Sequence, residues 1–320
     1  MAVYVVTGGA GFIGSNLVRR LLKESGAVRV VDDFSTGREQ NLSGLEQLIA
    51  IWRGDICDAG VLAEAFDGAD YVFHQAALAS VQASMKDPVA TNRVNVEGTV
   101  RVLDAARRAH VKRVVFASSC AVYGLDPELP KREDMAPAPA SPYAASKLAG
   151  EHYCRAFNYS LGVETVSLRY FNVFGPRQDP SGAYSAAIPI FIRAILDGRP
   201  VRLFGDGNQS RDFVYVDDVA EANLLAARAP KPAGAVMNIG TGVRYTLNEV
   251  VMLLSNLIGR PASVELLRQR PGDIVHSEAD IGRAGELIGY LPETSFEDGL
   301  RRTIEWCDSG AEPGLPRDGG

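Results

Sequence analysis

The first 24 residues place a glycine-rich turn between a strand pattern and a helix pattern. VYVVT is a short β-branched run, and NLVRRLLKE repeats its apolar residues at helical spacing. Between them, Gly8, Gly11 and Gly14 of TGGAGFIG fit a G-x-x-G-x-x-G spacing. Glycines in such a turn let the backbone approach a pyrophosphate, which then lies at the N-terminus of the helix. The segment therefore predicts that the fold begins with a dinucleotide-binding unit.

An acidic residue stands where a dinucleotide-binding unit needs one. Asp32 ends the second strand-like run, VRVVD, 18 residues after Gly14. A carboxylate there accepts hydrogen bonds from the ribose hydroxyls of adenosine and repels a 2′-phosphate, which favours NAD over NADP. Asp55 and Ile56, after the next run, are expected to frame the adenine. The alternative is that the glycines only make a tight turn and Asp32 only caps a loop. The strand, the helix and the acid together favour the dinucleotide.

Strand-like runs and helix patterns alternate through the first half of the chain. Further apolar runs at 71–75, 113–117 and 163–168 are typical of buried parallel strands, and VRVLDAARRA (100–109) is typical of a helix. This alternation predicts an α/β fold with a Rossmann-type, doubly wound parallel sheet. The rhythm breaks after about residue 172, and this predicts a second, smaller domain of mixed α/β structure.

We expect the chain to cross between these two domains more than once. The NAD-binding domain is expected to comprise residues 1–172 and about 213–239, and the second domain about 173–212 and 240–311. The tail at 312–320 is expected to be disordered. Within the second half, helix patterns lie near 185–197, 217–229 and 247–259, and a strand followed by a glycine turn lies at 235–242.

Composition and charge narrow the class of protein. The chain has 320 residues, 46% of them hydrophobic, with a net charge of −6, which argues against general binding to nucleic acid or to an anionic membrane. The four cysteines form no C-x-x-C pair and the four histidines have no ligand spacing, so no metal site is expected. A strand begins by residue 3 and no apolar run could span a membrane, which predicts a soluble cytoplasmic protein.

The segment YAASK places Tyr143 and Lys147 on one face of a helix, with Ser141 and Pro142 as its start. A free tyrosine is a poor base at neutral pH, because its pKa is about 10. A lysine ammonium nearby, together with a positive nicotinamide ring, would stabilise the phenolate and lower that pKa. The alternative is a half-buried tyrosine packed under an exposed lysine. The preceding dinucleotide motif favours the catalytic interpretation.

The sequence resembles the extended short-chain dehydrogenase/reductase family, and within it the nucleotide-sugar 4-epimerases, from about residue 3 to 308. The motifs that carry this resemblance are TGGAGFIG, VDDFSTG, HQAA, NVEGT, FASSCAVYG, SPYAASKLAGE, LRYFNVFGPRQDP, GDGNQSRDFVYVDDVA and RPGD. The resemblance implies a tightly bound NAD. The residues expected to contact it are Gly8, Gly11, Phe12, Ile13, Gly14, Asp32, Asp33, Ser35, Asp55, Ile56, Gln75, Ala76, Ala77, Ser118, Tyr143, Lys147 and Tyr170.

The resemblance also assigns the reaction centre. It implies that Tyr143 is the base and that Ser119 binds the sugar O4 and shares the proton. The related 4,6-dehydratases carry Asp-Glu directly after this serine or threonine, and the decarboxylases keep a Glu in the second place. This chain has Cys120 and Ala121 there, which disfavours elimination and decarboxylation. What remains is oxidation of C4 followed by return of the hydride to the other face, which inverts that carbon.

For the substrate, the resemblance implies a UDP-sugar held mainly by the smaller domain. The positions that match the family's substrate contacts are Ser80, Ser119, Asn172, Phe204, Arg211, Arg270, Asp273 and Ser277. Two arginines suit a diphosphate through charge-assisted hydrogen bonds. Members restricted to plain hexoses have a bulky tyrosine at the position of Ser277, so the small serine leaves room for an N-acetyl group. UDP-GlcNAc and UDP-GalNAc are therefore expected as substrates, and UDP-Glc and UDP-Gal stay open as further ones.

Other functions stay open at this point. A UDP-glucose or UDP-glucuronate 4-epimerase is the nearest alternative, followed by a nucleotide-sugar dehydratase or reductase. From a different class, a non-catalytic NAD-sensing module is disfavoured because such proteins usually lose the tyrosine or the lysine. The resemblance finally implies a homodimer, in which the helices near 88–109 and 143–160 of each subunit form a four-helix bundle.

Overall fold

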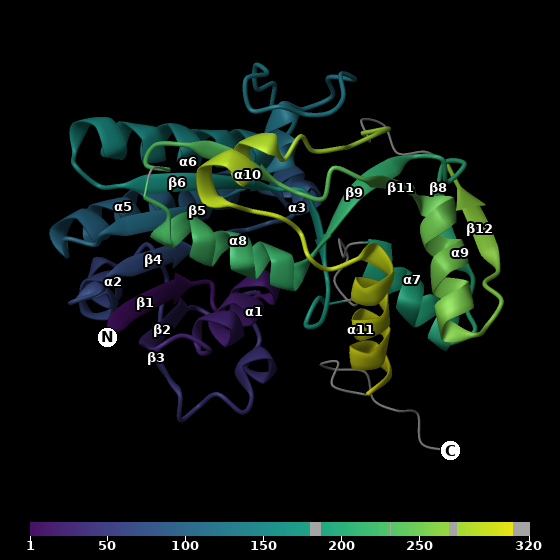
Figure 1. Ribbon diagram of the computed structural model, residues 1–320, viewed down its shortest axis with the longest axis horizontal. Coiled ribbons are helices and arrows are strands. Elements are labelled where there is room, and N and C mark those ends of the chain that lie inside the picture. The colour runs from purple at the N-terminus through teal and green to yellow at the C-terminus, as the bar shows by residue number, and fades with distance from the viewer. Residues whose placement is uncertain (180–186, 231, 269–273, 310–320) are drawn as a thin grey trace.

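A seven-stranded parallel sheet forms the centre of the larger part of the molecule (Figure 1). The computed structural model describes residues 1–179, 187–230, 232–268 and 274–309. The strands of the sheet stand in the order β10-β6-β5-β4-β1-β2-β3. Their bounds are β1 Ala2–Thr7, β2 Gly26–Asp32, β3 Ile49–Arg53, β4 Tyr71–His74, β5 Arg113–Ser119, β6 Thr165–Tyr170 and β10 Val236–Ile239.

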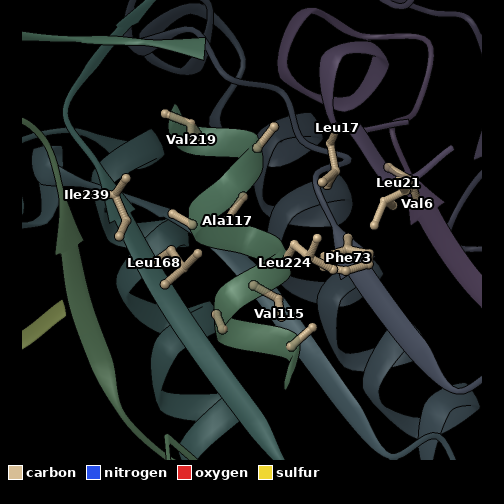
Figure 2. Packing of buried hydrophobic residues seen from close by; sticks show 14 of the residues in the cluster. Val6, Leu17, Leu21, Phe73, Val115, Ala117, Leu168, Val219, Leu224 and Ile239 are labelled. Atoms are coloured by element: carbon tan, nitrogen blue, oxygen red, sulfur yellow. The ribbon is translucent and has the colours of Figure 1, made fainter. Parts of the chain in front are cut away.

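Helices cover both faces of this sheet because successive strand residues point to opposite faces. In β1, for example, Val6 packs on one face and Val5 on the other. The first face is covered by α1 (Phe12–Leu21), α8 (Val216–Arg228) and α10 (Gly282–Ile288). The second is covered by α2 (Ala59–Phe66), α5 (Gly98–Arg108) and α6 (Pro142–Ser160). Figure 2 shows α8 lying across the strands, with Leu224 close to Phe73.

The smaller part carries two short sheets and its own apolar core, and lies to the right in Figure 1. In one sheet, β9 pairs in parallel with β7 and antiparallel with β11, while β8 and β12 form a parallel pair. The bounds here are β7 Asn172–Phe174, α7 Ala187–Leu196, β8 Val201–Phe204, β9 Ser210–Tyr215, β11 Arg244–Thr246, α9 Leu247–Ile258, β12 Val264–Leu267 and α11 Phe296–Asp308.

The predicted α/β class and the parallel doubly wound sheet are confirmed. A helical segment is present near 88–109 as expected, but its course is not regular. It comprises α4 (Pro88–Asn92), a π-helical turn (Arg93–Glu97) and α5, and is preceded by the short α3 (Val81–Lys86). The tail expected to be disordered, 312–320, lies outside the described residues. In the described ranges, no helix is long and apolar enough to cross a membrane.

Candidate active site

A cleft runs along the carboxyl ends of the central strands. It lies where the strand order reverses, because β2 and β3 follow β1 on one side and β4 to β6 follow on the other. Ligands of open α/β sheets bind at this kind of position. We call it the strand-end cleft. Every residue that the sequence predicted to contact NAD lines it. Sequence reasoning missed these lining residues: Val31, Thr36, Gly37, Gly54, Leu78, Ala79, Val94 and Ala117. All but Val94 stand within two positions of a predicted residue.

The glycine-rich turn forms a cradle with no space for side chains. Gly8 has a φ of +71°, and a Cβ on it would lie 2.6 Å from the backbone nitrogen of Ala76. A Cβ on Gly14 would lie 2.1 Å from the carbonyl oxygen of Gly8. Helix α1 begins after Gly11 and has no side-chain cap, so no side chain of the cap occupies the N–H groups of its first turn. These features fit the pyrophosphate of a dinucleotide.

Asp32 lines the strand-end cleft and also holds the glycine-rich turn. Its carboxylate accepts hydrogen bonds from the backbone nitrogens of Ala10 and Phe34, both at 2.8 Å. Burial raises the pKa of Asp32, although these two hydrogen bonds oppose the shift. A carboxylate offers about four acceptor sites, so ribose hydroxyls can still bind to those that remain. The two interpretations of Asp32, loop cap and ribose ligand, are therefore compatible.

Tyr143 and Lys147 lie together at the start of α6 and are both buried. The Ser119 side chain lies next to the Tyr143 phenol and acts to lower its pKa, and the Lys147 amine donates to the carbonyl oxygen of Ala117 at 2.8 Å. Burial lowers the pKa of Lys147 to about 8. Burial also raises the pKa of Tyr143 to about 12, while the hydrogen bond with Ser119 acts in the opposite direction.

In the protein without cofactor, Lys147 therefore does not bring the pKa of Tyr143 below its usual value, although the sequence predicted that it would. The two side chains lie near each other, with the Lys147 nitrogen 5.9 Å from the centre of the Tyr143 ring. Desolvation of the phenol nevertheless dominates its titration. Sequence could not show this, because the spacing of the two residues says nothing about how deeply the ring is buried.

Ser118, which was expected beside the nicotinamide, lines the cleft, but its hydroxyl binds a residue outside the cleft lining. Its hydroxyl donates to the carboxylate of Glu151 at 2.5 Å. Glu151 in turn accepts two hydrogen bonds from Arg169, each at 2.8 Å, and this ion pair is buried. The Arg169 guanidinium also lies 4.7 Å from the centre of the Tyr123 ring. A charged pair thus fixes the end of β5 next to Ser119.

A second buried group connects the cleft to α8. The hydroxyl of Tyr170 accepts from the amide of Asn223 at 2.8 Å and from that of Gln75 at 3.1 Å. Both Tyr170 and Gln75 line the strand-end cleft. Burial raises the pKa of Tyr170 well above its usual range, and the amides of Asn223 and Gln75 hold its hydroxyl in place.

The residues predicted to bind the sugar nucleotide are more dispersed. Asn172 begins β7, Phe204 ends β8, and none of Ser80, Asn172, Phe204, Arg211 and Ser277 lines the strand-end cleft. The hydroxyl of Ser80 caps α3 by accepting from Ala83 at 3.0 Å. Ser277 is buried beside β9, its backbone nitrogen donating to Ser210 at 3.1 Å. The remaining two predicted residues, Arg270 and Asp273, lie outside the described residues.

Arg211 lies on the reaction-centre side of the second part of the chain. Its guanidinium donates to the carbonyl oxygens of Ser210 and Val275. Its charge also acts on the thiol of Cys120, which follows Ser119. Burial nevertheless raises the pKa of Cys120 to about 11, so this thiol is neutral at physiological pH. An arginine and a neutral thiol therefore lie near Ser119.

Comparison with known proteins identifies the family. Residues 4–240 match the NAD dependent epimerase/dehydratase family. This chain belongs to that family. It is 42% identical over 308 residues to a UDP-glucose 4-epimerase of Mycolicibacterium smegmatis, across 94% of this chain and 97% of the relative. This similarity identifies the chain as an NAD-dependent nucleotide-sugar 4-epimerase, and the arrangement of Ser119, Tyr143 and Lys147 agrees with it.

Two solved structures are closely similar. One is a UDP-N-acetylglucosamine 4-epimerase from Methanobrevibacter ruminantium in complex with UDP-N-acetylmuramic acid. It has a TM-score of 0.92 and 42% identity, covering 96% of this chain and 98% of that one. The other is a UDP-glucose 4-epimerase of Thermus thermophilus in complex with NAD. It has a TM-score of 0.88 and 39% identity, covering 96% of this chain and 99% of that one. NAD is therefore the cofactor of this fold, in agreement with the cradle and Asp32.

Proposed function

We propose that this epimerase interconverts UDP-GlcNAc and UDP-GalNAc, and that it also accepts UDP-Glc and UDP-Gal. The observation that carries the proposal is the small side chain of Ser277. It is buried on a segment that runs beside β9, the strand that bears Arg211. A small residue there leaves space that an acetamido group can occupy. The similarity to an epimerase solved with an N-acetylated UDP-sugar supports the same substrate class.

The chemistry is divided among three side chains. Tyr143 removes the proton of the sugar 4-hydroxyl, and Ser119 binds the same oxygen and lowers the pKa of the phenol by its hydrogen bond. Lys147, held by the carbonyl oxygen of Ala117, keeps a cation beside the tyrosine. NAD held by the glycine-rich turn and Asp32 would supply the hydride acceptor for C4 and a positive ring that offsets the burial of the phenol. The 4-keto sugar turns over and takes the hydride back on its other face, and Tyr143 returns the proton to O4, so C4 is inverted.

The cofactor is proposed to stay bound between turnovers. The hydride that leaves C4 returns to the same carbon, so the reaction needs no second substrate. Retention is supported by the enclosed glycine cradle and by the hydrogen bonds that fix Asp32 next to it. Purified protein should therefore carry dinucleotide without any being added.

The test is to mix purified protein with UDP-GlcNAc, without added NAD, and to follow the anomeric protons by NMR. Appearance of UDP-GalNAc supports the proposal, with Tyr143→Phe as the inactive control. Ser277→Tyr should then lose activity on UDP-GlcNAc while keeping it on UDP-Glc. Conversion of UDP-Glc or UDP-glucuronate alone would leave the mechanism intact but refute the substrate. A keto product that accumulates only when NAD is supplied would refute the epimerase mechanism itself.

We also propose a homodimer that packs through the helices before and including α6. Support comes from exposed apolar side chains on adjoining elements: Met85 of α3 is 62% exposed, Val89 of α4 78% and Tyr153 of α6 41%. Isolated apolar residues on a surface are ordinary, but a group of them on neighbouring helices is typical of an interface. Sedimentation velocity should show a dimer that Val89→Asp weakens and Val243→Asp, a remote exposed control, does not. A monomeric wild type would refute the dimer.

A further inference from the structure

The backbone nitrogen of Tyr143 needs a partner that its own helix cannot supply. Tyr143 is the second residue of α6, and the first N–H groups of a helix have no acceptor within it. The capping residue Ser141 accepts from Ala144 at 3.2 Å, so its side chain serves the next position. The N–H of Tyr143 instead donates to the side-chain oxygen of Ser84, at 3.1 Å.

Ser84 comes from a different helix and is held rigidly. It lies in α3, 59 residues earlier in the chain, and is 0% exposed. Its own hydroxyl proton is used, because Ser84 donates to the carbonyl oxygen of Val81 at 2.6 Å. The oxygen therefore meets Tyr143 as an acceptor in a fixed orientation. Ser80 in turn caps α3, which secures the helix that carries Ser84.

The carbonyl oxygen of Tyr143 is held from the other side. It accepts from the hydroxyl of Ser146 at 2.8 Å, and Ser146 accepts from the amide of Asn95 at 2.9 Å. Asn95 lies in the π-helical turn and also binds both backbone groups of Leu78, at 2.8 and 3.1 Å. Since Leu78 lines the strand-end cleft, the backbone of Tyr143 is tied to the wall of the cleft.

We propose that Ser84 is a positioning residue for the epimerase reaction. By fixing the N–H of Tyr143, it sets where the phenol stands relative to Ser119 and to the 4-hydroxyl of the sugar. Without the serine oxygen, a buried N–H would lose its acceptor, and the start of α6 would shift to regain one. Small displacements of a catalytic group are costly, up to about a hundredfold in rate for 1 Å. Ser84 is fully buried and does not line the strand-end cleft, so its effect is expected on turnover rather than on binding.

The test compares wild type with Ser84→Ala on whichever UDP-sugar the wild type epimerises. The expected result is a fall in kcat of about tenfold, with KM and the bound NAD unchanged. Because a displaced phenol loses its hydrogen bond with Ser119, the acid limb of the kcat–pH profile should also shift to higher pH. The control is Ser295→Ala, which removes a comparable hydroxyl cap from the distant α11 and should leave kcat and the pH profile as they are.

Each outcome decides the question. A Ser84→Ala protein that has lost thermal stability like the control but keeps wild-type kcat and pH profile would overturn the proposal. Should the alanine variant not fold, Ser84→Cys preserves the size of the side chain and weakens only the acceptor. A lower kcat at unchanged KM in that variant supports the positioning role, and a wild-type kcat refutes it. A wild type that epimerises UDP-Glc but not UDP-GlcNAc would refute the substrate proposed above and leave this test applicable.

Discussion

Replacing Lys147 with methionine should make the protein more stable and abolish its activity. The ammonium is buried, and burial lowers its pKa from 10.5 to about 8. At pH 7 the charged side chain therefore costs roughly 3 kcal/mol of folding free energy, at 1.36 kcal/mol for each pKa unit. Methionine has a similar length and no charge. It loses the hydrogen bond to Ala117, worth about 1–2 kcal/mol. We expect Lys147→Met to be about 1–2 kcal/mol more stable than wild type at pH 7.

The pH dependence gives this prediction its sign. Folding lowers the pKa of Lys147, so between pH 8 and 10.5 the unfolded chain binds more protons than the folded one. The stability of the wild type therefore rises with pH in this window, by up to about 1.36 kcal/mol for each pH unit. Lys147→Met has no such group, so the advantage of the variant should shrink as the pH rises and disappear near pH 10.

The assay is urea unfolding followed by circular dichroism at pH 7, 8, 9 and 10, on protein freed of dinucleotide. Lys112→Met serves as the control, because this lysine lies on the surface in an ion pair with Asp70 and should give no gain in stability. Lys147→Met should show no turnover at any of these pH values, since the cation beside Tyr143 is gone. A variant that is less stable than wild type, by an amount that does not change from pH 7 to 10, would refute the reasoning.

Three further changes test other parts of the site. Gly14→Ala should abolish retention of NAD, measured as dinucleotide in the purified protein, because its Cβ would meet the Gly8 carbonyl oxygen at 2.1 Å; a fully loaded variant would contradict the cradle. Asp32→Ala should reduce the preference for NAD over NADP by about tenfold or more, measured by calorimetry, since it removes the charge that repels a 2′-phosphate. Arg169→Met should cost about 3–5 kcal/mol of unfolding free energy in urea, because it leaves the Glu151 carboxylate buried without its partner; an unchanged midpoint would contradict this.

The part of the site built from local sequence could be predicted well. Most of the expected cofactor contacts lie at or shortly after the end of a strand-like run, and parallel strands bring their carboxyl ends to one edge of the sheet. That is why Gly8, Asp32 and Gln75, far apart in the chain, all line the strand-end cleft. Ser119 and Tyr143 are likewise paired because β5 and α6 are neighbouring elements.

Features that depend on tertiary contacts could not be predicted. The hydrogen bond between Ser84 and Tyr143 joins residues 59 positions apart, and neither the α3 segment nor its serine carries a motif. The π-helical turn around Asn95 has a sequence compatible with a regular helix, and the bonds of Asn95 to Leu78 and Ser146 that hold its side chain inward are tertiary contacts. The high pKa of Tyr143 depends on burial, which spacing does not encode.

The position of β10 has a consequence for how the protein is made. This strand completes one edge of the large sheet beside β6, yet the ribosome produces it only after β7, α7, β8 and β9. Helix α8, which covers α1 and the first face of the sheet, also comes late. A nascent chain that ends at Tyr170 therefore contains six of the seven strands of the large sheet. The edge at β6 is still open, and one apolar face of the sheet is still uncovered. The dinucleotide-binding half cannot close during synthesis until residue 239 has emerged, so early contact with chaperones is expected to protect that surface.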